Sequence, residues 1–294
     1  MLSLITIIAL AGQVHAESAA AFLRTLQQPS GGFISDQLRP GELAQPTLRT
    51  TRTALRTCRM LGVAVPRRDV VVAFHAGCYD PESGGFAAWP GAEPDPISTS
   101  VGLMILRELK LPSDAYLDRG LAFMNEHTQG FEQIRMVAPA LEEFHVSVPN
   151  AQKWIEQLRA TMNADGTWGS GPGAARTTAL YGVTIQRLGG QVDREAVLRV
   201  LRAGQRADGG FGGDTAGGSD LESCYRIVRV LYRLDTAPDR VDDLRAFIAS
   251  CQNDDGGYGR TPDQPSSLHG TYYATIVTTW LDDLEQRGAE SAGR

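Results

Sequence analysis

A short glycine-aromatic segment recurs six times along the chain, and it restricts the fold more than any other feature of the sequence. The copies read QQPSGGF, YDPESGGF, HTQGF, MNADGTW, QRADGGF and QNDDGGY, and they end at Phe33, Phe86, Phe131, Trp168, Phe211 and Tyr258. Successive aromatic residues lie 37 to 53 residues apart, which corresponds to a repeat of about 45 residues with a degenerate third copy. A period of that length indicates a fold built from copies of one supersecondary unit.

Each repeat has the same internal order. An amphipathic segment with apolar residues three and four apart comes first, as in 194–205 and 241–252, and this spacing predicts a helix. The glycine turn ends that helix, because glycine tolerates a positive φ. A second segment, apolar on most sides, follows the turn and is predicted to be a buried helix; examples are 98–109, 177–188, 222–234 and 270–281.

Alternating amphipathic and apolar helices predict an all-α protein with an outer layer around an inner one. No segment alternates apolar and polar residues as a half-buried strand does. Periodicity alone fits an open solenoid as well as a closed ring.

Composition excludes several classes of protein. The chain has 294 residues, a net charge of −6 and no block of lysine or arginine, so nucleic acid and anionic membrane surfaces are not expected partners. Four cysteines are scattered without a CxxC pair, which argues against a disulfide framework and against a zinc ribbon.

The first sixteen residues leave two interpretations open. Residues 1–16 hold an apolar stretch followed by Val14-His15-Ala16, which is typical of a signal-peptidase site, although no basic residue precedes it. The other interpretation is an apolar N-terminal extension of the first helix. Localisation therefore stays open between export and the cytoplasm.

The repeat also resembles a known group of families. Segments 22–33 and 247–258 share an aromatic, an aliphatic, a glutamine, a glycine and a final aromatic in the same order. This pattern resembles terpene cyclases and protein prenyltransferase β subunits, the prenyltransferase/squalene-cyclase repeat superfamily, and is most similar to Rab geranylgeranyltransferase β subunits. The resemblance implies an α/α toroid of six helical hairpins, a double-layered α6-α6 barrel, over residues 17–285, with a C-terminal tail over 286–294.

The same resemblance implies a catalytic zinc site. The family takes an acid-x-Cys pair and a histidine from the last two repeats, and Glu222, Cys224 and His269 stand at those positions, with Glu222 where the family has aspartate. A carboxylate, a thiolate and an imidazole leave one position of Zn²⁺ open for a substrate thiol. With Ser219 as N-cap, Glu222 and Cys224 would share the first helical turn and could meet one ion.

Ordinary structural roles remain open for each of these residues. Ser219 and Glu222 have the spacing of a capping box. Cys224 aligns with Thr178 and Thr271 of the neighbouring repeats, so it also fits a small buried residue. His269 would then be a residue at a helix start.

Tyr225 matches a family tyrosine that hydrogen-bonds the isoprenoid diphosphate. The family also places an arginine and a lysine before the acidic ligand, where this chain has Ala216 and Ser219. The diphosphate site is therefore predicted to be weakened, with Arg176, Arg226 and Arg229 as candidate replacements. An apolar cavity for the isoprenoid is expected among inner-helix tyrosines, namely Tyr181, Tyr225, Tyr272 and Tyr273.

The resemblance implies a zinc-dependent transferase that moves geranylgeranyl or farnesyl from its diphosphate to a cysteine thiolate of a protein or peptide, together with a helical α subunit. The alternative is a divergent, non-catalytic binding toroid that has lost diphosphate chemistry. A terpene cyclase is disfavoured because the sequence has no DxDD acid.

Overall fold

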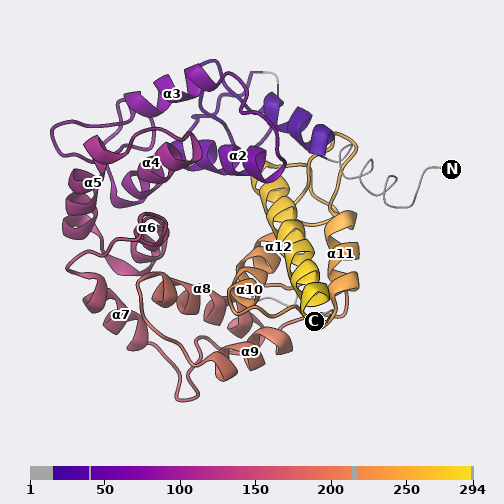
Figure 1. Cartoon of the computed structure of the whole chain (residues 1–294). Coiled ribbons are helices and arrows are strands. Elements are labelled where there is room, and N and C mark those ends of the chain that lie inside the picture. The colour runs from indigo at the N-terminus through magenta and orange to yellow at the C-terminus, as the bar shows by residue number, and fades with distance from the viewer. Residues whose placement is uncertain (1–15, 40, 214–216, 293–294) are drawn as a thin grey trace.

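The computed structural model describes residues 16–39, 41–213 and 217–292, and this part of the chain is helical (Figure 1). Within these ranges the only β-type pairings are isolated bridges at the glycine-aromatic turns and nearby loops, and there is no strand. The prediction of an all-α protein is therefore confirmed. Among the described helices, none combines the length and the apolarity that crossing a membrane requires.

The helices form two concentric layers (Figure 1). The inner layer consists of α2 (Leu48–Met60), α4 (Pro96–Glu108), α6 (Gly130–Phe144), α8 (Ala174–Arg187), α10 (Leu221–Arg233) and α12 (Leu268–Ala292). The outer layer consists of a helical segment over residues 16–25 together with α3 (Arg68–Gly77), α5 (Asp114–His127), α7 (Ala151–Arg159), α9 (Arg194–Ala203) and α11 (Val241–Ser250). A short 3-10 turn, η1 (Gly171–Gly173), precedes α8.

The inner helices close into a ring. Each contacts the next one along the chain, and the last inner helix, α12, packs against the first, α2, as well as against α10. An open solenoid would leave α2 and α12 apart. The toroid is therefore confirmed, and it was the resemblance that distinguished it from a solenoid.

Burial follows the two helical patterns. Every residue of α4 from Ser98 to Leu106 is buried, because an inner helix is covered by its two inner neighbours and by the outer layer. In α9 only Ala196, Val197 and Leu201 are buried, which is the single apolar stripe of a helix with one face in water.

The glycine-aromatic turn joins the layers by one repeated hydrogen bond. The backbone N–H of the aromatic residue donates to a threonine hydroxyl in the first turn of the following inner helix. The four pairs are Phe33 to Thr51 at 3.1 Å, Phe86 to Thr99 at 2.9 Å, Trp168 to Thr178 at 3.0 Å and Tyr258 to Thr271 at 3.0 Å. Since all four hydroxyls are on fully buried threonines, this bond fixes α2, α4, α8 and α12 against their own turns.

Glycine is required at this turn by space as well as by conformation. Gly209 has φ of +81°, and a Cβ there would lie 2.4 Å from the Asp243 carbonyl carbon. The turn therefore reaches the next outer helix, α11, at backbone contact.

The structure corrects one expectation and adds detail to two others. Asp220, rather than Ser219, caps α10, because its carboxylate accepts from the Ser223 N–H, while the Ser219 hydroxyl donates to Asp208. In the third repeat Phe131 lies inside α6, so that copy has no separate loop. Helix α12 continues through residues 286–292. The signal-peptide interpretation concerns residues 1–16, of which 1–15 lie outside the described residues.

We predict that Thr99→Val destabilises the protein by about 1–3 kcal/mol, because the buried Phe86 N–H loses its acceptor. Thr279→Val is the matched control, since the Thr279 hydroxyl bonds only a carbonyl of its own helix, and it should change the free energy of unfolding by less than about 0.5 kcal/mol. Urea denaturation measures both variants. If Thr99→Val and Thr279→Val have equal free energies of unfolding, the hydrogen bond of the turn does not contribute the stability that we assign to it.

Candidate functional site

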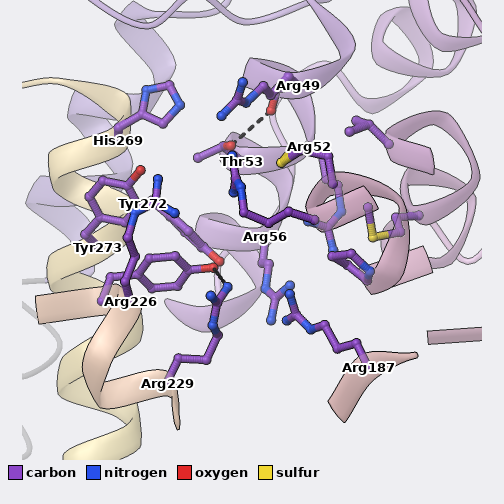
Figure 2. Close-up of a pocket in the computed structure, with 16 residues that line it drawn as sticks. Arg49, Arg52, Thr53, Arg56, Arg187, Arg226, Arg229, His269, Tyr272 and Tyr273 are labelled. Atoms are coloured by element: carbon purple, nitrogen blue, oxygen red, sulfur yellow. Dashed lines mark hydrogen bonds between the residues drawn. The ribbon is translucent and has the colours of Figure 1, made fainter. Parts of the chain in front are cut away.

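A cavity is lined by residues from all six inner helices, and these helices surround the axis of the toroid (Figure 1). It encloses about 110 Å³ available to the centre of a water molecule. Figure 2 shows the lining side chains converging from α2, α8, α10 and α12. The arrangement follows from the ring, because each inner helix turns one face toward the axis.

Arginine dominates the wall of this cavity. Seven of its sixteen lining residues are arginines: Arg49, Arg52 and Arg56 from α2, Arg135 from α6, Arg187 from α8, and Arg226 and Arg229 from α10. The three on α2 are three and four residues apart, which places them on one face of that helix. The expectation of an apolar cavity was therefore wrong, because charged side chains occupy the axial face.

Four of these arginines have carboxylate partners that stand behind the wall. Arg187 lies 3.0 Å from Glu142, and Arg52 lies 3.3 Å from Glu143. Arg135 pairs with Glu132, and Arg226 pairs with Glu222. Among the described residues no carboxylate side chain lines the cavity itself, so the acids hold the arginines without occupying the space they face.

Arg49, Arg56 and Arg229 have no carboxylate within ion-pair distance in the part of the chain that the structure describes. The buried Nε atoms of Arg52, Arg56 and Arg229 have no hydrogen-bond acceptor there either. Burying cations near one another is unfavourable unless an anion offsets it. The cavity therefore has an excess of positive charge and donors without acceptors, which is the composition of an anion site.

The pKa values of two of these arginines reflect this crowding. Burial lowers the pKa of Arg187 to about 9, and the neighbouring Arg229 lowers it further in the same direction. Burial also lowers the pKa of Arg52, and Arg56 adds to that effect. Both shifts have the direction expected when cations are removed from water and placed side by side.

The aromatic part of the wall comes from α10 and α12. Tyr225 stacks on Tyr273 with ring centroids 4.9 Å apart, and Tyr272 lies 5.5 Å from it. Arg229 donates to the Tyr225 hydroxyl at 3.2 Å. Tyr225 is thus at the cationic cavity, while its predicted contact with a diphosphate stays a prediction. Tyr181 is not a lining residue; it stacks on Phe131 at 4.1 Å.

An apolar part of the wall lies on the opposite side. It consists of Val101 and Met104 from α4 and of Met136 and Pro139 from α6. The cavity thus has a cationic side and a smaller apolar side, and a ligand that matches both would be an amphiphilic anion.

The three residues predicted to bind zinc have different surroundings in the structure. His269 lines the cavity beside Arg49 (Figure 2), and burial, followed by Arg49, lowers its pKa. Cys224 is fully buried outside the cavity, and its Sγ lies 3.3 Å from the Phe211 N–H. Glu222 is ion-paired with arginines. Among the described residues no three His, Cys, Asp or Glu side chains are placed to hold a metal ion, so this trio does not fit zinc as it stands.

Sequence reasoning missed most of the arginines. It named Arg226 and Arg229 as replacements for the missing basic pair, and both line the cavity. Arg176 does not line it and instead pairs with Glu222 at 3.3 Å. Two positions hold an arginine and a lysine in the family and Ala216 and Ser219 in this chain. Ala216 lies outside the described residues, and the Ser219 hydroxyl donates to Asp208. The detectable signal was Arg49-x-x-Arg52-x-x-x-Arg56 on an inner helix.

Comparison with known proteins places the fold in a family. A family model described as the prenyltransferase alpha-alpha toroid domain matches residues 1–119, 57–141 and 114–291. The protein farnesyltransferase subunit beta of Arabidopsis thaliana is 31% identical over 149 residues, which is 47% of this chain and 30% of that protein. The geranylgeranyl transferase type-2 subunit beta of Candida albicans is 36% identical over 85 residues, 29% of this chain and 24% of that one. The chain thus spans less than a third of these relatives.

Solved structures agree on the fold alone. The type II terpene cyclase MstE from Scytonema superposes with a TM-score of 0.62 at 14% identity, covering 93% of this chain and 98% of that one. The ent-copalyl diphosphate synthase from Streptomyces platensis gives a TM-score of 0.51 at 19% identity, covering 89% of this chain and 54% of that one. At such identities the likeness concerns the toroid and not the chemistry in its cavity.

We predict that Glu142→Gln destabilises the protein by about 1–2 kcal/mol, because Arg187 at 3.0 Å and Arg233 at 2.6 Å lose their shared carboxylate. This loss is smaller than for a fully buried ion pair, because the Glu142 side chain is 34% exposed and water screens its charge. Glu285→Gln removes an exposed pair with Arg245 and should have almost no effect. Thermal and urea unfolding of both variants test this, and similar losses in the two would contradict it.

The effect of Glu142 should also depend on pH. Burial alone would raise the pKa of Glu142, but Arg187 and Arg233 outweigh it and hold the pKa below its ordinary value. A carboxylate of this kind contributes its full stability above its unfolded pKa of about 4.3 and loses it as pH falls through the lower folded value. The difference between wild type and Glu142→Gln should therefore persist from pH 7 to about pH 5 and shrink below about pH 4. A difference that disappears near neutrality would contradict this account.

Proposed function

The chain belongs to the prenyltransferase alpha-alpha toroid domain family, and from that membership we propose that it binds an isoprenyl diphosphate, with the diphosphate among the arginines of the axial cavity. The observation that carries the proposal is the group formed by Arg49, Arg56 and Arg229, three cations without a carboxylate partner in the described part of the chain. A diphosphate supplies the missing negative charge. It also offers several acceptor oxygens to the guanidinium N–H groups.

The shape of the cavity supports an amphiphilic ligand. The diphosphate would lie against α2, α8 and α10, and the first carbons of the isoprenoid would lie against Val101, Met104 and Met136. About 110 Å³ of space is small beside the roughly 300–1,000 Å³ of typical ligand sites. A short isoprenoid therefore fits better than a long one, unless the two flexible methionines move.

The same arginines favour chemistry in which diphosphate leaves. Negative charge grows on a departing diphosphate, and fixed guanidinium donors in a site sheltered from water stabilise it. The Tyr225 hydroxyl, already held by Arg229, can donate to the same group. Cyclisation begun by a protonating acid has less support, because among the described residues no carboxyl group lines the cavity.

The fuller activity implied by the family stays a proposal. It comprises transfer of farnesyl or geranylgeranyl to a cysteine of a protein acceptor, with zinc activating the thiol and a helical α subunit as partner. The related β subunits carry the names of such transferases. Because Glu222, Cys224 and His269 do not fit zinc in this arrangement, no step is assigned to the metal. That observation favours a second candidate, a toroid that binds the diphosphate without transferring the isoprenoid to a thiol.

We predict that Arg56→Gln and Arg229→Gln each weaken binding of geranyl diphosphate by about tenfold or more, because each removes a charged donor to the diphosphate. Arg199→Gln, on the exposed face of α9, is the matched control and should bind as the wild type does. Isothermal titration calorimetry at fixed ionic strength measures all four proteins. Equal affinities in the wild type and the two cavity variants, or no binding by the wild type, would overturn the proposal.

A further inference from the structure

The fifth repeat has a cysteine where four other repeats have a threonine. In those repeats the threonine hydroxyl accepts from the N–H of the turn aromatic at 2.9–3.1 Å. In the fifth, the Phe211 N–H donates to the Cys224 Sγ at 3.3 Å, and the thiol in turn lies 3.8 Å from the Phe211 carbonyl oxygen. A sulfur acceptor is larger than a hydroxyl oxygen, so 3.3 Å is the same contact made with a longer bond.

The surroundings of Cys224 match those of the threonines. Its side chain has no exposed surface, like those of Thr51, Thr99, Thr178 and Thr271. It packs in the core with Phe211, Leu221 and Ile227, away from the cavity. Nothing in this position directs the sulfur toward the axis.

Glu222 is held by three arginines at once. Its Oε1 accepts from Arg226 Nε at 3.0 Å and from Arg226 Nη2, and it lies 3.3 Å from Arg176 Nη2. Its Oε2 accepts from Arg260 Nη2. Both oxygens are thus engaged, on a side chain that is only 14% exposed. Binding a metal would require breaking these contacts and leaving the arginines near a second cation.

We propose that Cys224 is the turn-closing acceptor of the fifth repeat and that Glu222 is the resident counter-ion of Arg176, Arg226 and Arg260, so that the acid-x-Cys pair supports the anion cavity and does not bind a metal. The part played by Cys224 is independent of what the cavity binds. The part played by Glu222 rests on the proposed function, since Arg226 is one of the arginines of the cavity wall.

Glu222 is accordingly a positioning residue. It occupies Nε and Nη2 of Arg226 and leaves the other N–H groups of that guanidinium for the cavity. Without this carboxylate the three arginines would repel one another and separate.

The test of Cys224 compares two replacements in metal-free buffer and in buffer with added zinc. Cys224→Thr restores the residue used by four other repeats and should unfold at the wild-type temperature, within about 1 °C. Cys224→Ala leaves the Phe211 N–H without an acceptor and should unfold about 3 °C or more lower. Added zinc should not change the unfolding temperature of the wild type or of either variant. The wild type should retain much less than one zinc per chain after dialysis. One tightly held zinc in the wild type, lost in both variants, would overturn the proposal.

The test of Glu222 uses charge. Glu222→Gln should unfold at a lower temperature than the wild type at low ionic strength, and inorganic diphosphate should restore most of that loss. Glu222→Asp keeps the charge, and its unfolding temperature should lie between those of the wild type and Glu222→Gln. Glu285→Gln controls for loss of a surface carboxylate. Unchanged stability of Glu222→Gln would overturn its counter-ion role. If diphosphate does not raise the unfolding temperature of the wild type, the proposed function is rejected instead. The result for Cys224→Thr would still decide the role of the thiol.

Discussion

A hydrogen bond from the turn amide to a side chain of the following inner helix holds the two layers of the toroid in register. It recurs in five of the six repeats, through threonine in four and through Cys224 in one. Because the donor and acceptor are buried, losing it costs the full desolvation of an amide. In the five repeats that have it, the bond sets the rotation of the inner helix about its own axis. That rotation decides which residues face the hollow of the ring, and hence where Arg56 and Arg229 point.

Once the helices are oriented, electrostatics determines what the hollow can hold. Carboxylates such as Glu142 and Glu222 lie behind the arginines and fix them, while the cavity itself contains no acid among the described residues. Four of the seven guanidinium groups, those of Arg52, Arg135, Arg187 and Arg226, are thereby held in place before a ligand arrives, so a bound anion need not reorganise them. The folded protein bears the cost of this arrangement as buried Nε atoms without acceptors. Such a cost is understandable where an anion removes it.

Much of the fold could be predicted from the sequence, and much less of the site. The glycine-aromatic copies and the two helix types predict the layers, since both depend on local patterns that each repeat carries. Closure of the ring depends on contact between α2 and α12, about 200 residues apart along the chain, and only the resemblance indicated it. The arginine cavity was missed because it needs the relative rotation of six helices, which no single segment encodes. For Cys224, the alignment with Thr178 and Thr271 indicated the same structural role as those threonines, but the family pattern suggested a metal ligand instead.

We propose that the arginines on the axis of the toroid hold a diphosphate. The sharpest test is a crystal structure of the protein with inorganic diphosphate, or with an isoprenyl diphosphate in which sulfur replaces the oxygen that joins the isoprenoid carbon to phosphorus. We expect both phosphorus atoms inside the cavity, with phosphate oxygens within hydrogen-bonding reach of the guanidinium groups of Arg56 and Arg229 and with the Tyr225 hydroxyl alongside. Diphosphate bound elsewhere on the protein, with the cavity arginines in contact only with water, would contradict it.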